Sequence, residues 1–188
     1  MMSTVTVLDR DGMNLLADKL GELVHACASV SLLRRGLCRA SVVGSPDDFS
    51  AALVSFDFMA DEPIAFGRDV DAIVALLDET DRFWGCVETT PDIVESLGER
   101  VRIHFGGSVR YYDAVYLSME GPAAEIPNDH VRLLADDDAE LWSNVEEEDM
   151  QAGGFGDVES HLRESFAAAA IVNGQIVSIA QASGITEQ

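Results

Sequence analysis

The sequence predicts an α/β protein with mixed α+β sheets, organised as two successive domains. Stretches with helical periodicity follow one another along the chain with short runs rich in β-branched and aromatic residues between them. The 188 residues, 47% of them hydrophobic, are enough to build a packed core. A stretch with two prolines at residues 121–130, GPAAEIPNDH, interrupts the pattern and predicts a linker between a domain at 1–120 and a domain at 131–188.

The first domain is predicted to begin with two helices and continue with three strands. Apolar residues spaced three and four apart indicate a helix from Met13 to Ala28 and a shorter one around residues 32–37. The pattern then changes to three β-rich runs separated by polar turns, ASVVG, FSAALVSFDF and PIAFG.

Helices and strands are predicted to alternate in the rest of this domain. Apolar residues at 70–77 indicate a helix, and FWGCVE is expected to form a buried strand. Pro91 favours the first turn of another helix, and Gly106 and Gly107 end it. The tyrosine- and valine-rich run SVRYYDAVYLSM predicts a long strand.

The second domain is predicted to run strand, helix, loop, helix, strand, turn, strand. VRLL is the first strand, and Asp136 to Val145 is helical, with acidic residues where the helix dipole favours them. A second helix covers Val158 to Phe166. Asn173 and Gly174 supply the two positive φ angles of a type I′ turn, which predicts a terminal hairpin.

Composition excludes several function classes. The first residues lack the pattern of a signal peptide and no apolar run reaches the ~20 residues of a membrane span, so we expect a cytoplasmic protein that binds no membrane. A formal charge of −22 opposes binding to nucleic acid. The cysteines and histidines are widely scattered, and we assign no metal.

The second arm of the predicted hairpin, residues 175–183, carries neither charge nor proline. Charged residues and prolines normally protect the edge strand of a sheet from pairing with another chain, and this strand has neither. We therefore expect that the chain can form a homo-oligomer through this strand.

The order of elements in the second domain, with VRLLADDDAELW at its start and AAAIVNGQIVSIAQAS at its end, resembles the first half of a GNAT-superfamily N-acetyltransferase domain. The resemblance implies transfer of an acetyl group from acetyl-CoA to an amine of unknown identity. In that superfamily a central strand and a glycine-rich turn, R/Q-x-x-G-x-G/A, would follow and hold the pyrophosphate of acetyl-CoA at a helix N-terminus. That strand and turn do not follow the hairpin, so we expect an incomplete second domain; a shortened chain, an interrupted gene or a partial sequence would each explain it.

The first domain has the superfamily's order for a whole domain. RYYDAVYL before the linker resembles a bacterial GNAT-like subgroup in which a degenerate domain precedes the catalytic one. Its phosphate turn would fall at Gly67, Arg68 and Asp69, where there is one glycine and an added negative charge. This pattern predicts a degenerate turn, although Arg68 at a helix start would still hold an anion weakly.

Four residues are candidates for the substrate side. In the resembling enzymes the loop between the first two helices borders the acceptor, which implies Phe155 and Gly156; the favoured alternative is a hydrophobic plug and a loop glycine. GGFG lies between two predicted helices and follows no strand, so it is interpreted as a loop. Gln181 and Ser183 share one face of the last strand. No catalytic or cofactor-binding residue is assigned.

Three functions remain open. The leading one is an N-acetyltransferase-like protein, with acetyl-CoA as cosubstrate and no metal, in which residues 1–188 alone are inactive. The alternative is a noncatalytic binding or assembly module derived from a GNAT fold. A third is a ligand sensor that holds a nucleotide-like anion near Arg68.

Overall fold

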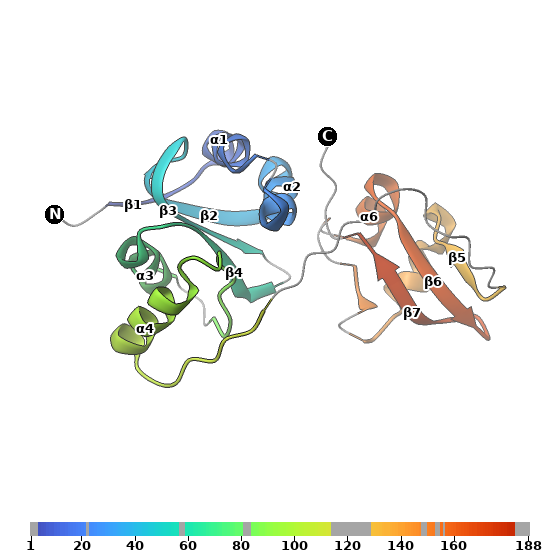
Figure 1. The fold of residues 1–188 in the computed structure, drawn as a ribbon. Coiled ribbons are helices and arrows are strands. Elements are labelled where there is room, and N and C mark those ends of the chain that lie inside the picture. Colours follow the sequence, from blue (N-terminus) through green and yellow to red (C-terminus); the bar gives the residue numbers. More distant parts are fainter. Residues whose placement is uncertain are drawn as a thin grey trace. The chain divides into compact units, whose positions relative to one another are not determined.

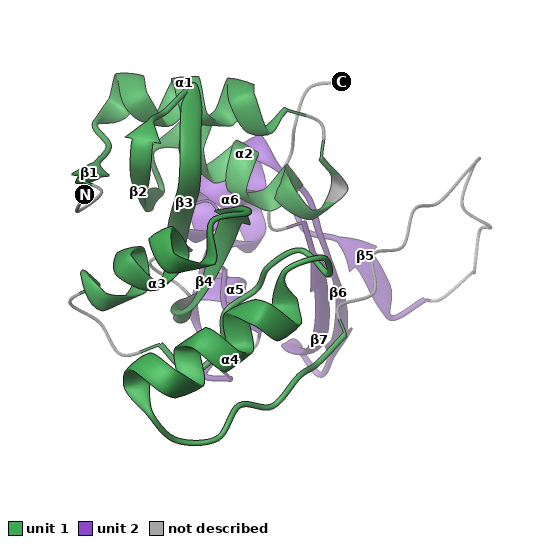
Figure 2. Ribbon diagram, turned by 60° about the vertical axis from the view of Figure 1, so that its left-hand side comes forward, with its two compact units in different colours: residues 1–115 green, residues 116–188 purple. Residues whose placement is uncertain are grey.

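The protein is an assembly of helices and two antiparallel sheets that falls into two compact units, residues 1–115 (unit 1) and 116–188 (unit 2) (Figure 2). The computed structural model describes residues 4–21, 23–56, 59–80, 84–113, 129–147, 150–152, 155 and 157–182. Most of the predicted linker, 121–128, lies outside the described residues.

Unit 1 contains a four-stranded antiparallel sheet, sheet A, with strand order β1-β2-β3-β4 (Figure 1). Its strands are β1 (Val5–Val7), β2 (Cys38–Ser45), β3 (Asp48–Phe56) and β4 (Met59–Gly67). The last three are the three strands predicted from the β-rich runs. β1 was missed because its three residues, VTV, are too few to show alternation.

Two helices, α1 (Arg10–Leu20) and α2 (Cys27–Arg35), connect β1 to β2. The prediction of one helix from Met13 to Ala28 was therefore wrong in its second half. Gly21 has a φ of 58° and ends α1, and a short 3₁₀ turn, η1 (Val24–Ala26), precedes α2. The apolar spacing continues across this turn, so periodicity alone did not reveal the break.

Sheet A is covered by helices on both faces (Figure 1). Leu16, Leu32 and Leu33 of α1 and α2 pack on one face against Val42 and Val54. On the other face lie α3 (Val70–Asp78) and α4 (Val94–Phe105). Their buried apolar residues contact Val43, Ala51, Leu53 and Ala65. Because both faces are buried at the centre of the sheet, β3 is apolar without alternation from Ala51 to Val54, whereas β2 still has an exposed Arg39 near its start.

Two predicted strands of unit 1 differ in the structure. FWGCVE is reduced to one parallel bridge between Ile64 and Glu88, because only residues 85–88 run along β4. The first part of SVRYYDAVYLSM, residues 108–113, forms no strand; its remainder lies outside the described residues. Tyr111 instead lies over Gly98 of α4, where an added Cβ would be 2.5 Å from the tyrosine hydroxyl.

Unit 2 contains a three-stranded antiparallel sheet, sheet B, with strand order β5-β6-β7. Its elements are β5 (Val131–Leu133), the 3₁₀ turn η2 (Asp136–Asp138), α5 (Ala139–Ser143), α6 (Val158–Glu164), β6 (Ala167–Val172) and β7 (Gln175–Gln181). The predicted hairpin is confirmed: Asn173 and Gly174 have φ angles of 52° and 76°. All predicted elements of this unit are present, with shorter helices than expected.

The core of unit 2 lies between sheet B and its helices. Trp142 of α5 is fully buried and packs with Ala167, Ala169 and Ile176 on one face of the sheet. Because β6 offers mostly alanine to this core, Trp142 supplies much of its volume.

Arg132 of β5 and Asp138 of η2 form a two-pronged ion pair, with Nη1–Oδ2 and Nη2–Oδ1 distances of 2.5 and 2.6 Å. Asp138 is 9% exposed, and its Oδ2 also accepts a hydrogen bond from the backbone N–H of Ala135. The guanidinium of Arg132 lowers the pKa of Asp138 from 3.8 to about 2. This pair fixes η2 to the first strand of the sheet.

Among the described residues, no helix has both the length and the apolar character needed to cross a bilayer.

We predict that Asp138→Asn lowers the free energy of unfolding of unit 2 by about 1–2 kcal/mol at pH 7, because Arg132 loses a charged partner. Since the folded pKa is depressed, this stabilisation is present above pH 3.8 and is lost as the pH falls toward about 2. Urea unfolding followed by Trp142 fluorescence in a Trp84→Phe background measures it. Asp137→Asn, an exposed neighbour in the same turn, is the control; an equal loss in both variants would contradict the prediction.

Candidate functional site

The turn after β4 is where the resemblance places a phosphate-binding turn in unit 1. Gly67 ends β4 with a φ of 108°, and a Cβ there would be 2.4 Å from the backbone oxygen of Ser50. Glycine is thus required at this position by the close approach of β3 to β4. The requirement comes from packing within the sheet.

The N-terminus of α3 is already occupied by a side chain of the protein. Asp69 is its N-cap, and its Oδ1 accepts a hydrogen bond of 3.1 Å from the N–H of Ala72. Arg68 is exposed and forms an ion pair of 3.3 Å with Asp92. The carboxylate of Asp69 repels an approaching anion, and the charge of Arg68 is partly neutralised.

A group of titratable side chains lies where residues 85–88 run beside β4. The N–H of Glu88 donates to the oxygen of Pro63 at 3.0 Å, and the N–H of Ala65 donates to the oxygen of Glu88 at 2.8 Å. Burial raises the pKa of Glu88, the charge of His25 lowers it, and Glu62 raises it again. The site thus holds a carboxyl group that keeps its proton to higher pH than usual.

Cys86, next to this group, is not an activated nucleophile. Burial raises the pKa of its thiol, and the nearby carboxylates of Glu62 and Glu88 raise it further. The reactive thiolate is therefore disfavoured. Sequence analysis missed this cluster; the predicted strand FWGCVE, with Cys86 and Glu88 at alternating positions, was the one signal for it.

In unit 2, Phe155 is a buried core residue. It is 3% exposed, and its ring centroid lies 4.7 Å from that of His161, which lies 4.9 Å from Trp142. His161 is fully buried on α6. This three-ring cluster fixes the loop before α6 onto both helices and matches the hydrophobic plug considered from the sequence.

The start of the same loop is held by two successive backbone oxygens. The indole N–H of Trp142 donates to the oxygen of Met150, and Nε2 of Gln181 donates to the oxygen of Gln151, each at 2.8 Å. The loop is thereby attached to α5 on one side and to β7 on the other. Of the predicted substrate-side residues, Phe155 thus belongs to the loop between α5 and α6 and Gln181 binds it from β7.

Gln181 also has a polar atom, Oε1, without a hydrogen-bond partner among the described residues. This atom is buried. A buried amide oxygen is expected to accept a hydrogen bond from a water, a ligand or another part of the chain. The other two predicted residues, Gly156 and Ser183, lie outside the described residues.

The letters of the glycine-rich pattern do occur once, at residues 151–156, QAGGFG. Their context is different from that of a phosphate turn. They lie between α5 and α6 instead of after a strand, and α6 has only seven residues. Asp157 caps α6 by accepting a hydrogen bond of 2.7 Å from the N–H of Ser160, so a carboxylate fills this helix start too.

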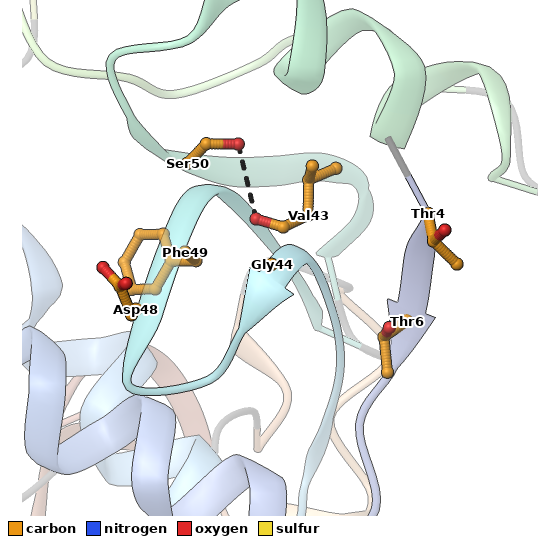
Figure 3. Close-up of a pocket in the computed structure, with 7 residues that line it drawn as sticks. All are labelled: Thr4, Thr6, Val43, Gly44, Asp48, Phe49 and Ser50. Atoms are coloured by element: carbon orange, nitrogen blue, oxygen red, sulfur yellow. Dashed lines mark hydrogen bonds between the residues drawn. The ribbon is translucent and has the colours of Figure 1, made fainter. Parts of the chain in front are cut away.

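A shallow, open hollow of about 530 Å³ lies at one end of sheet A (Figure 3). It is lined by Thr4, Thr6, Val43, Gly44, Asp48, Phe49 and Ser50. The hydroxyl of Ser50 donates to the oxygen of Val43 at 3.4 Å, and Asp48 is exposed. None of the residues predicted for the substrate side lines it.

A scan against models of known protein families gives no match for this chain, and a search of curated proteins finds no similar sequence. In the part of the chain that the structure describes, no three metal-ligating side chains come together.

We predict that Phe155→Ala destabilises unit 2 by about 3 kcal/mol, because it removes a buried ring and leaves a cavity beside His161. Thermal or urea unfolding of the full chain measures the change. Phe166→Ala removes the same side chain from a site that is 59% exposed and should cost less than about 1 kcal/mol. Equal losses of stability in the two variants would contradict a structural role for Phe155 and would keep it as a substrate-side candidate.

Proposed function

We propose that the protein is N-acetyltransferase-like, of the GNAT type, with an acetyl group moving from acetyl-CoA to an amine, and that unit 1 is a noncatalytic domain of this fold. The observation that supports the proposal is the shared order of the two units. In each, a short strand and a pair of helices precede an antiparallel strand pair: β1, α1, α2, β2, β3 and β5, α5, α6, β6, β7. In unit 1 this order continues through β4, a glycine turn, α3 and a segment parallel to β4.

The proposed reaction needs positioning more than covalent help from the protein. The amine nitrogen attacks the thioester carbonyl, the new C–N bond forms, the C–S bond breaks, and CoA leaves as a thiolate while a base removes the amine proton. Backbone N–H groups near the carbonyl oxygen and a fixed amine supply most of the rate. Gln181 is the candidate for contact with the acceptor amine, because it lies next to the loop between α5 and α6 and its Oε1 has no hydrogen-bond partner among the described residues; this atom is buried, so the loop would have to move for the amine to reach it.

Unit 1 is assigned the noncatalytic part because its helix start is filled. Asp69 accepts from Ala72, Arg68 pairs with Asp92, and the close approach to Ser50 accounts for Gly67. These contacts also favour the second candidate, a binding or assembly module that has kept the fold without the cofactor. The two candidates differ in whether the protein transfers acetyl groups at all.

The experiment that separates them uses the protein isolated from its own cells with an antibody against residues 1–188. The sample is incubated with acetyl-CoA and a panel of amines (a polyamine, an aminoglycoside, a lysine peptide and a peptide with a free N-terminus), and release of the CoA thiol is followed. We expect thiol release with at least one amine. No release with any amine, and no retention on immobilised CoA, would leave the binding module as the function.

For residues 1–188 alone we predict no acetyl-CoA binding with a Kd at or below ~10 μM, equivalent to about −7 kcal/mol. The reason is that both helix starts next to glycines are capped by carboxylates, Asp69 and Asp157. Calorimetric titration measures it. If tight binding is seen, Asp69→Lys and Asp157→Lys identify the helix start involved, and the assignment of unit 1 as noncatalytic fails if only Asp69→Lys alters the Kd.

A further inference from the structure

The face of sheet A that carries α3 is built from two rows of side chains that cross the strands. Residues directly opposite each other in an antiparallel sheet lie on the same face. The rows are Val5–Val43–Ala51–Gly67 and Val7–Ser41–Leu53–Ala65. Val43, Ala51, Leu53 and Ala65 are at most 5% exposed, because the apolar face of α3 covers them.

Sheet B has two equivalent rows, which we call the bare face. They are Leu133–Ala168–Ala180 and Val131–Ala170–Ser178. Leu133 is 66% exposed and Val131 44% exposed, while Ser178 and Ala180 are also exposed. The helices of unit 2 pack on the opposite face, where Ala167, Ala169 and Ile176 are buried with Trp142.

The two faces correspond element by element. In both units the helix pair lies between the first and second strands, the three strands are antiparallel neighbours, and the helix pair covers the face that alternates with these rows. Small residues lie on each face, Ala51 on β3 and Ala65 on β4 in unit 1 and Ala168 and Ala170 on β6 in unit 2. Small side chains allow a helix backbone to come close to a sheet.

Charge is also absent from this region. The 15 residues from Ala167 to Gln181 include no charged side chain, although the chain carries a net charge of −22. A solvated sheet face normally alternates apolar with polar residues. A face that is exposed, apolar and uncharged in so acidic a protein is typical of an interaction surface.

We infer that the bare face of sheet B binds an amphipathic α-helix with a Val/Ile/Leu face of the kind that α3 presents to sheet A. The helix of unit 1 shows the chemistry of the occupant: Ile73, Val74, Leu76 and Leu77 are the side chains that it buries. The bound helix lies across β6 and β7, with its apolar face on the two alanine-centred rows. This inference rests on the repeated order of the two units and does not require acetyl transfer.

The probe is a fluorescent peptide with the sequence of residues 69–79, held helical by a side-chain staple. Asp71→Lys and Asp78→Lys are introduced into it to avoid repulsion by a chain of net charge −22. The full chain, residues 1–188, is titrated into the peptide, and fluorescence anisotropy is recorded. We expect saturable binding that a peptide with Ile73→Glu and Leu77→Glu does not show.

Val131→Glu in the protein tests the surface, and Val7→Glu is its control. Val131 occupies the place in its row that Val5 has in sheet A, and Val5 packs against the cluster that contains the buried residues of α3. Val131 and Val7 are both exposed, at 44% and 75%, so neither change disturbs a core. We expect Val131→Glu to weaken binding at least about tenfold and Val7→Glu to leave it within about twofold. Circular dichroism checks that both variants are folded.

Three results would overturn the inference. The first is no saturable binding to the unmodified chain, which would mean that another part of the chain covers the face. The second is an equal effect of the two substitutions. The third is a concentration-dependent dimer in sedimentation that Val131→Glu abolishes, which would make a second copy of the chain the occupant.

Discussion

The burial of the central residues of β2 and β3 on both faces is the constraint on which unit 1 depends. Because these residues have no solvated face, each residue from Ala51 to Val54 contacts one or the other helix pair. A shift of one residue in the register would exchange the two sets of side chains and fit neither. The sheet therefore fixes where α1 and α2 pack on one side and α3 and α4 on the other, and through β4 it fixes the turn at Gly67.

Unit 2 also has an antiparallel strand pair, β6 and β7, but the helices of this unit cover only one of its faces. Alanine at four successive positions of β6 gives its core face little volume, so the rings of Trp142, Phe155 and His161 fill the space. The ion pair of Arg132 with Asp138 and the two hydrogen bonds to the loop add polar contacts at the periphery of this core. Removing one ring thus affects the loop as well as the helices.

Many of the helices and strands could be predicted from the sequence, and the wrong predictions have physical causes. Strands β2 to β4 and the Asn173-Gly174 hairpin were found because β-rich runs are bounded by turn residues. The break after α1 was missed because Leu23 and Val24 keep the helical spacing across the 3₁₀ turn. The tyrosine run was misread because high β-propensity does not reveal that Tyr111 has a place over Gly98.

The candidate site was harder to predict. Gln181 and Phe155 were predicted on separate grounds, and only the fold shows that Gln181 binds the loop that contains Phe155. Glu88 and Cys86 were not recognised as part of a titratable group, because their neighbours Glu62 and His25 lie on other elements. The sequence predicted a degenerate phosphate turn at Gly67; the structure shows that the close approach of β3 to β4 is what requires glycine there.

The hydrogen bond between Gln181 and Gln151 joins residues 30 positions apart, and this separation has a consequence for the order of events during synthesis. The ribosome makes the chain from its N-terminus, so α5 and the loop exist before the strand that holds the loop in place. Trp142 reaches the oxygen of Met150 within eight residues, but the second anchor must wait for β7. Until then the loop is held only by its contacts with α5 and α6. The pairing of β7 with β6 therefore also brings the second anchor of the loop into place, which links the order of the loop to the formation of this strand pair.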